Sequence, residues 1–284
     1  MYLLLFVQHC GKPYLYLRVY ENKLSLVALV LLKIEEYLTT LPDSILSGED
    51  VQLPKEAFRE ILKFANISKD DIFYHLGCGD GTGLVVAKEE FNCKKIIGID
   101  NSKQKINTAL KILKEKNYSD IRIFCENIED SNFDDADVIL FWFVDDNILE
   151  KMMPKFSKLK QGTRIITIWG PLPECLPQKV EFPYIMNQVP FNKTKDLQEQ
   201  LLAIFDVKCV DFVTAWEFAE RYTKTIGSEN PENDRFLTII QSLVIWINAK
   251  NLGVACGDDI PEPIQNYISI LKKFFNIEVE HLLK

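Results

Sequence analysis

The chain has 284 residues, of which 47% are hydrophobic and 26% charged, as in ordinary soluble globular proteins. Its net charge of −8 at pH 7 is concentrated in residues 171–284, which contain 11 Lys and Arg against 16 Asp and Glu. This acidic segment argues against a nucleic-acid partner, because phosphate binding requires clustered Lys and Arg, although the 15 Lys of residues 53–170 leave room for a local basic patch.

Seven cysteines are scattered along the chain without any C-x-x-C pair, and there are only 3 His. This odd, unpatterned set predicts neither a disulfide framework nor a zinc or other metal site, and a reducing cytoplasm fits it best.

The first 52 residues form an N-terminal extension for which we expect a packing strand or helix. The mostly apolar run Leu24–Leu32 is far shorter than the roughly 20 residues of a spanning helix, so no membrane partner is expected. A translation start at a later, non-Met codon is the alternative, since the next methionine is Met152.

Residues 53–170 alternate short apolar runs with amphipathic segments. A helix is expected from Leu53, because Pro54 and Glu56 suit a first helical turn, and a second helix from Ser102 buries Ile106, Ala109, Leu110 and Leu113. Strands are expected at 71–76, 95–99, 121–124, 136–143 and 164–169, with further helices ending near 91 and spanning 148–159. This alternation predicts a doubly wound, mostly parallel Rossmann-like sheet of the α/β class.

After Trp169 the pattern changes. The proline-rich stretch 170–190 predicts irregular structure or short edge strands. Helical periodicity follows at 195–205, 210–226, 232–250 and 262–275. We therefore expect three parts, an extension over 1–52, a nucleoside-binding domain over 53–190 and a helical C-terminal appendage over 191–284.

The helical appendage contains many aromatic residues at helical spacing. We expect them to form its core, and a surface for a partner or substrate is the alternative. The residues are Phe212, Trp216, Phe218, Tyr222, Phe236, Trp246, Tyr267, Phe274 and Phe275.

The most informative segment is the glycine-rich stretch Tyr74–Gly83, which follows an expected strand and opens a helix. Glycines allow the backbone to approach a ligand, and Asp100 at the end of the next strand can accept both hydroxyls of a ribose. A dinucleotide fingerprint would require glycine at Thr82 or Leu84, and a G-K-[ST] phosphate loop is absent. The segment therefore indicates a different nucleoside ligand.

The motif Leu76-Gly-Cys-Gly-Asp-Gly81 resembles the first motif of the seven-strand S-adenosylmethionine-dependent methyltransferases. The order of motifs over 53–170 looks most like the small archaeal protein-lysine methyltransferases and the nucleosomal lysine methyltransferases of the same fold. The resemblance implies S-adenosylmethionine as the cofactor, with Asp100 and Asn101 at its ribose and adenine recognised after the third strand. Its implied binding residues are His75, Gly77, Cys78, Gly79, Asp80, Gly81, Asp100, Asn101, Asn127 and Ile128.

His75 departs from the family pattern, since Asp or Glu usually stands at this position. An acid helps to hold the cationic methionyl end of the cofactor, which a neutral imidazole does less well and a protonated one opposes. A buried packing role, an adjusted binding mode and lost catalysis are the three interpretations.

Trp142 and Asp145 are the candidate catalytic residues, because they follow the fourth strand, where the methyl acceptor is expected to bind. The D/N-P-P-Y/F sequence of many base-methylating enzymes is absent there. Trp142 could line an aromatic channel for an alkylamine, with core packing as the alternative, and Asp145 could cap the next helix. Trp169 is a second candidate for the pocket wall, again with packing as the alternative.

The combined prediction is a cytoplasmic S-adenosylmethionine-dependent methyltransferase that acts on protein lysine or another amine. A small-molecule methyltransferase is one alternative. A non-catalytic S-adenosylmethionine-binding module with a helical partner-binding tail is the other.

Overall fold

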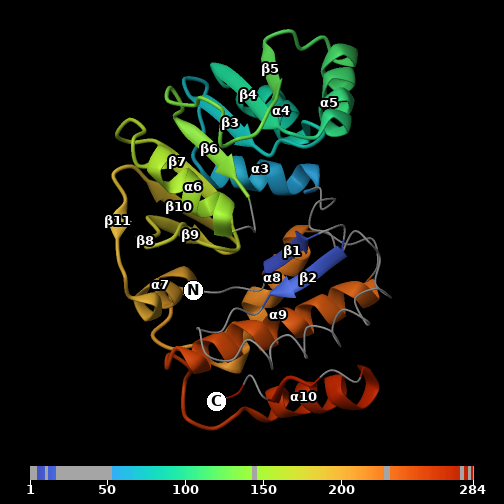
Figure 1. Ribbon diagram of the computed structural model, residues 1–284, viewed down its shortest axis with the longest axis vertical. Helices are drawn as coiled ribbons and strands as arrows, with labels where there is room; N and C mark the ends of the chain where they lie inside the picture. Colours follow the sequence, from blue (N-terminus) through green and yellow to red (C-terminus); the bar gives the residue numbers. More distant parts are fainter. Residues whose placement is uncertain are drawn as a thin grey trace. The chain divides into compact units, whose positions relative to one another are not determined.

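The computed structural model describes residues 5–9, 12–16, 53–142, 146–226, 231–275, 278–280 and 283. The chain forms two compact units (Figure 1). One is 52–195, and the other combines the N-terminal segment with 196–284.

The unit 52–195 is built on a seven-stranded sheet in the order β5-β4-β3-β6-β7-β10-β9. Neighbouring strands from β5 to β7 are parallel, and β10 pairs antiparallel with both β7 and β9. The strands are β3 (Ile72–Leu76), β4 (Lys95–Asp100), β5 (Ile121–Cys125), β6 (Val138–Phe141), β7 (Arg164–Ile168), β9 (Lys179–Glu181) and β10 (Tyr184–Gln188). This is the doubly wound, mostly parallel sheet expected from the sequence.

Helices pack on both faces of this sheet. They are α3 (Lys55–Phe64), α4 (Thr82–Val86) with its π-helical continuation η1 (Ala87–Phe91), α5 (Lys103–Glu115) and α6 (Asp146–Phe156). Met152 and Phe156 of α6 join a buried core with Tyr74, Ile99 and Phe141 from three strands. Because side chains alternate along a strand, Phe73 and His75 point to the opposite face, where α3 contributes Phe58.

Helix α5 begins at Ser102, whose hydroxyl accepts the Lys105 N–H, and it buries Ile106, Ala109 and Leu113. The expectation that Leu110 also points inward is wrong, because 48% of this residue is exposed. A helix has only a limited stripe facing its sheet, and Leu110 lies one position beyond it.

The proline-rich stretch forms more of the sheet than expected. β9 is an edge strand, as predicted, but β10 lies inside the sheet between β7 and β9. Pro183 and Pro190 flank β10 and do not interrupt it, so Tyr184–Gln188 keeps all of its N–H groups for pairing. A two-stranded pair, β8 (Cys175–Leu176) with β11 (Asn192–Lys193), lies beside it in sequence.

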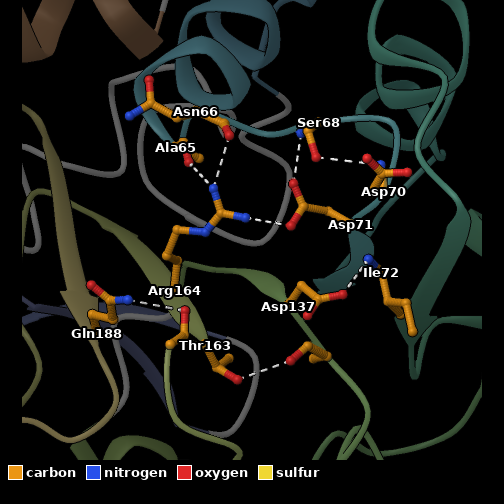
Figure 2. A network of polar contacts seen from close by, with 12 residues as sticks. Ala65, Asn66, Ser68, Asp70, Asp71, Ile72, Asp137, Thr163, Arg164 and Gln188 are labelled. Carbon is orange, nitrogen blue, oxygen red and sulfur yellow. Dashed lines mark hydrogen bonds and ion pairs between the residues drawn. The ribbon is translucent and has the colours of Figure 1, made fainter.

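Arg164 ties α3 to the amino edge of the sheet (Figure 2). Its guanidinium donates to the carbonyl oxygens of Ala65 and Asn66 at 2.6 and 2.8 Å and forms an ion pair with Asp71. The paired side chains are only 19% and 13% exposed. A bidentate donor in so sheltered a position fixes the end of α3 against β7.

Asp137 performs a similar task at the same edge. Its carboxylate accepts the Ile72 N–H at 2.8 Å and forms an ion pair with Lys160 at 2.6 Å. This contact joins the starts of β3 and β6 (Figure 2).

The second unit is mainly helical in its described part. It contains α7 (Leu197–Phe205), α8 (Phe212–Ile226), α9 (Pro231–Asn251) and α10 (Glu262–Phe275), close to the predicted ranges. Its hairpin strands β1 (Leu5–His9) and β2 (Lys12–Tyr16) pair antiparallel. No helix in the described ranges combines the length and apolar character needed to cross a membrane.

A disulfide joins Cys209 and Cys256, with a Cα–Cα distance of 5.1 Å. The expectation of no disulfide is therefore wrong. The two cysteines are 47 residues apart, so spacing gave no signal for the pair. They meet because Val210 pairs with the segment after α9: its N–H donates to Val254 O, and its carbonyl accepts the Cys256 N–H.

Candidate active site

The candidate site lies at the carboxyl edge of the sheet, where β3 has β4 on one side and β6 on the other. The chain moves outward to β4 and β5 in one direction and to β6 and β7 in the other. Loops at such a switch point diverge to opposite faces and leave a crevice, which is where open α/β sheets bind ligands.

The loop after β3 is shaped by three glycines. Gly77, Gly79 and Gly81 have φ values of 81°, 55° and 81°, a left-handed region that other residues rarely adopt. The N–H groups of Gly77 and Cys78 both donate to Ile99 O, at 2.8 and 3.0 Å, which fastens the loop to the end of β4. Gly77 and Gly79 remain partly exposed, so their backbone is open to a ligand.

Asp100, at the end of β4, contacts this loop through its carboxylate. It accepts the Gly79 N–H at 2.9 Å through Oδ2 and the Ser102 N–H at 2.9 Å through Oδ1. Only 9% of the residue is exposed. Two backbone donors thus orient the carboxylate while each oxygen keeps a second lone pair for a ligand hydroxyl.

Cys78 and Asp80 support the loop by different means. The Cys78 side chain is buried beside Gly98, where an added Cβ would lie 2.7 Å from its sulfur, and burial raises the pKa of the thiol. Asp80 accepts the N–H and hydroxyl of Thr82 at 2.8 and 2.7 Å, so it ties the loop to the first residue of α4. Cys78 is only 2% exposed, and its N–H and carbonyl groups are bonded to Ile99 and Gly81, so this residue supports the loop from within.

The other side of the crevice is formed by residues after β4 and β5. The Asn101 amide donates to Asn127 Oδ1 at 3.3 Å, and both residues are exposed. Ile128 is 7% exposed and packs into the core below them. The exposed amides of Asn101 and Asn127 offer hydrogen-bonding groups to a planar base.

His75 is 5% exposed and lies among apolar groups. Its ring packs edge-on against Phe58 at 5.4 Å and near Phe73 at 6.3 Å. A Cβ on Gly83 would approach its Nδ1 to 2.9 Å, and this nitrogen has no hydrogen-bond partner. Burial lowers the pKa of His75 to about 3, so the imidazole is neutral at physiological pH.

Trp142 follows β6 directly. Leu76 pairs with Phe141 in the β3–β6 register, so Trp142 is level with Gly77 on the neighbouring strand. Phe141 is fully buried, whereas Trp142 is partly exposed. Trp169, at the end of β7, is buried against Phe182 with the rings 5.2 Å apart.

The structure thus places nearly all of the candidate residues along one edge, and Asp145 lies outside the described residues. The described ranges contain no group of His, Cys, Asp or Glu arranged to hold a metal ion. Sequence reasoning missed Phe58 and Gly83, which surround His75, because nothing in the sequence indicates that α3 packs over this position.

The open left-handed glycines and the anchored, partly accessible Asp100 fit a ligand with a ribose diol and an adenine. A seven-stranded sheet in this order with such a loop defines a class I, Rossmann-like methyltransferase fold.

A family model described as a methyltransferase domain matches residues 67–220, so the chain belongs to this methyltransferase domain family. Its domain is S-adenosylmethionine-dependent.

A protein-lysine N-methyltransferase from Saccharolobus islandicus (strain REY15A) is 36% identical over 122 residues, which are 41% of this chain and 73% of that protein. Among solved structures, an RNA methyltransferase from Salinibacter ruber in complex with S-adenosyl-L-homocysteine gives a TM-score of 0.46 at 21% identity. It is matched over 51% of this chain and 97% of its own. A precorrin-6y C5,15-methyltransferase from Geobacter metallireducens GS-15 gives 0.35 at 13% identity, over 40% of this chain and 60% of its own.

Proposed function

We propose that this chain transfers a methyl group from S-adenosylmethionine to an amine, and that the amine is a protein lysine side chain. The observation that carries the proposal is the partly exposed Trp142, level with Gly77 across the switch point. The 36% identical protein-lysine N-methyltransferase supports lysine as the acceptor. In this proposal residues 53–190 form the catalytic domain, and residues 191–284 form a helical appendage that binds the acceptor protein.

The binding roles follow from the contacts around the crevice. Gly77 and Gly79 present backbone groups to the methionyl part, and Asp100 accepts the ribose hydroxyls. Asn127 contacts the adenine through its exposed amide, and the buried Ile128 supports this loop from the core. Gly81, Cys78 and Asp80 hold the loop and the start of α4 in place. When bound, S-adenosylmethionine supplies a methyl group carried on a positively charged sulfur.

His75 acts in this proposal as a neutral packing residue. A carboxylate at its position would favour the cationic cofactor over the neutral product through charge attraction. With the His75 pKa lowered to about 3, no such attraction exists at neutral pH. We therefore expect S-adenosylmethionine and S-adenosylhomocysteine to bind with similar affinities, within roughly fivefold, and calorimetric titration of both ligands measures the ratio.

The acceptor amine must reach the methyl group without its proton. A free lysine has a pKa near 10.4, and an apolar aromatic site lowers it by desolvating the charged form. The nitrogen lone pair forms the new N–C bond, the C–S bond breaks with its electrons on sulfur, and the product ammonium releases a proton to water. Aligning the two reactants can contribute about 7–11 kcal/mol in favourable cases, which is the task we assign to Trp142.

The acceptor class is tested by incubating purified protein with cell extract and S-adenosylmethionine labelled in its methyl group. We expect the label in the protein fraction, recovered as methyl-lysine after hydrolysis. Label in the small-molecule or nucleic-acid fraction would contradict the lysine acceptor but keep methyl transfer. No S-adenosylhomocysteine above the heat-inactivated control would show a non-catalytic binding module.

The role of Trp142 is tested with Trp142→Ala and Trp142→Phe. We expect Trp142→Ala to reduce kcat by at least about a hundredfold while the cofactor Kd stays within twofold, because alignment of the acceptor is lost. Trp142→Phe should retain most activity. Asp145→Asn, in the proposed capping role, should have the smaller effect. Loss of activity in Asp145→Asn with an unaffected Trp142→Ala would contradict the amine mechanism and indicate an acceptor that needs a base.

A further inference from the structure

Three aromatic rings form a cluster between α8 and α10, outside the site described above. Phe212 and Trp216 lie one turn apart on α8 with ring centroids 6.2 Å apart. Tyr267 of α10 lies 6.0 Å from each of them. Phe212, Trp216 and Tyr267 are called the aromatic cluster below.

The rings of the aromatic cluster are less buried than the core residues of the same unit. Phe218 and Trp246 are 8% and 1% exposed, as core residues should be. The three rings of the cluster are all partly exposed, and Val213 beside Phe212 is 67% exposed. Single exposed apolar side chains are common, but three adjacent rings open to solvent indicate a recognition surface.

The spacing of the rings suits a cation. Three centroids 6.0–6.2 Å apart form a nearly equilateral triangle. A positive charge about 3.5 Å above its centre would lie about 5 Å from every centroid, inside the roughly 6 Å range of cation–π attraction. The Trp216 and Tyr267 planes differ by 25°, and the Phe212 plane is tilted by 42° and 50° from them.

Acidic residues accompany the cluster. Asp211, directly before Phe212, is exposed, and the backbone N–H of Thr214 lowers the pKa of its carboxyl group. Asp258 and Asp259 are exposed in the segment before α10.

The Cys209–Cys256 disulfide and the backbone pairing of Val210 hold the segment that leads to Asp258 and Asp259 beside the start of α8. The exposed Lys208 precedes the disulfide, and the basic residues in the second half of α8, Arg221 and Lys224, form ion pairs with Glu217 and Glu220. Three exposed carboxylates, those of Asp211, Asp258 and Asp259, thus outnumber this one exposed lysine. The charge around the cluster therefore complements a basic ligand.

We propose that the aromatic cluster binds an alkylammonium group, and that its ligand is a methylated lysine within a basic peptide segment. Methylation favours such a site because it weakens hydration of the ammonium while keeping the charge. The choice of methyl-lysine rests on the proposed lysine acceptor. The cluster would then hold a substrate that already bears one methylated lysine while another is presented for transfer.

The proposal is tested with the full chain, without cofactor, by fluorescence anisotropy of three labelled peptides. All three share a short Lys- and Arg-rich sequence and differ at one position. That position is trimethyl-lysine, unmodified lysine or a neutral isostere with carbon in place of the quaternary nitrogen. We expect trimethyl-lysine to bind about tenfold more tightly than the neutral isostere and several-fold more tightly than lysine.

Substitutions distinguish cation–π attraction to the rings from general apolar contact with the peptide. Trp216→Leu should abolish the preference for trimethyl-lysine, and Tyr267→Phe, which keeps the ring, should retain it. Val213→Ala, which removes exposed apolar area without removing a ring, should leave every Kd within twofold. Equal binding of the trimethyl-lysine and isostere peptides, or binding of neither, overturns the proposal.

Because no methyl transfer is involved, these results do not depend on the labelling experiment. A negative result there with a positive result here would leave the aromatic cluster as a reader of methyl-lysine without the transfer function.

Discussion

Replacing Asp100 by Asn tests how the cofactor loop is held. The carboxylate accepts the Gly79 and Ser102 N–H groups, both at 2.9 Å. The Asn side chain has one acceptor oxygen, so its amide group must face one of these two donors. The substitution also removes the charge proposed to bind the ribose hydroxyls while nearly preserving the shape of the side chain.

The expected magnitude follows from these bonds. A hydrogen bond to a charged group contributes about 1.5–3 kcal/mol and one to a neutral group about 0.5–1.5 kcal/mol. Two ribose bonds weakened in this way correspond to about 2–3 kcal/mol, or a Kd for S-adenosylmethionine raised roughly 30- to 150-fold. The orphaned backbone donor should lower the free energy of unfolding by about 1–2 kcal/mol.

Asp137→Asn is the matched control. Asp137 also accepts a backbone N–H, that of Ile72 at 2.8 Å, but at the amino edge of the sheet. Its ion pair with Lys160 is partly exposed, at 29% and 45%, and should contribute little. We expect a similar loss of stability by urea unfolding and, by calorimetry, a cofactor Kd within twofold of the unsubstituted protein.

Two results would refute this reasoning. One is an unchanged Kd in Asp100→Asn, which would place the ribose elsewhere. The other is an equal loss of affinity in both variants, which would show that general destabilisation, and not the carboxylate charge, governs binding.

Three further predictions concern stability, each measured by urea unfolding. With its pKa lowered to about 3, His75 takes up no proton in the folded state between about pH 6.5 and 3, whereas the unfolded chain does. The contribution of His75 to the free energy of unfolding should therefore be fully present above pH 6.5 and should decrease by up to about 1.4 kcal/mol per pH unit below it. His75→Gln should remove this pH dependence. If the unsubstituted protein and His75→Gln lose stability identically with falling pH, the buried neutral His75 is contradicted. Arg164→Met leaves one oxygen of the sheltered Asp71 carboxylate and two carbonyls without their guanidinium donor, so it should destabilise by about 2–4 kcal/mol, and a loss below about 0.5 kcal/mol would refute the role of the network. Replacing Cys209 and Cys256 by Ser should lower stability by about 2–4 kcal/mol, and free alkylation of both thiols without reductant would show that the disulfide does not form.

The central part of the fold was predictable because its signals are local. Continuous apolar runs separated by helical periodicity indicate buried parallel strands, and the distance from Gly77 to Asp100 reveals one strand–helix–strand unit. The glycine loop and its acid could therefore be identified from spacing alone. The structure adds that both oxygens of Asp100 are held by backbone donors.

Other features depend on contacts between distant residues, which no local pattern encodes. The strand β10 exists because Tyr184–Gln188 pairs with β7 and β9, although prolines around it resemble loop sequence. The Cys209–Cys256 disulfide depends on how α8 meets the end of α9. The same holds for the aromatic cluster, since helical spacing does not distinguish a ring facing the core from one beside it. The cytoplasmic location stays a prediction.

The most direct test of the central claim is a calorimetric titration of the full chain with S-adenosylmethionine and, separately, with NAD. The loop at Gly77–Gly81 and the carboxylate of Asp100 predict saturable binding of S-adenosylmethionine with one site per chain and no heat of binding for NAD. Binding of NAD, or no binding of S-adenosylmethionine or its demethylated product at millimolar concentration, would contradict the account.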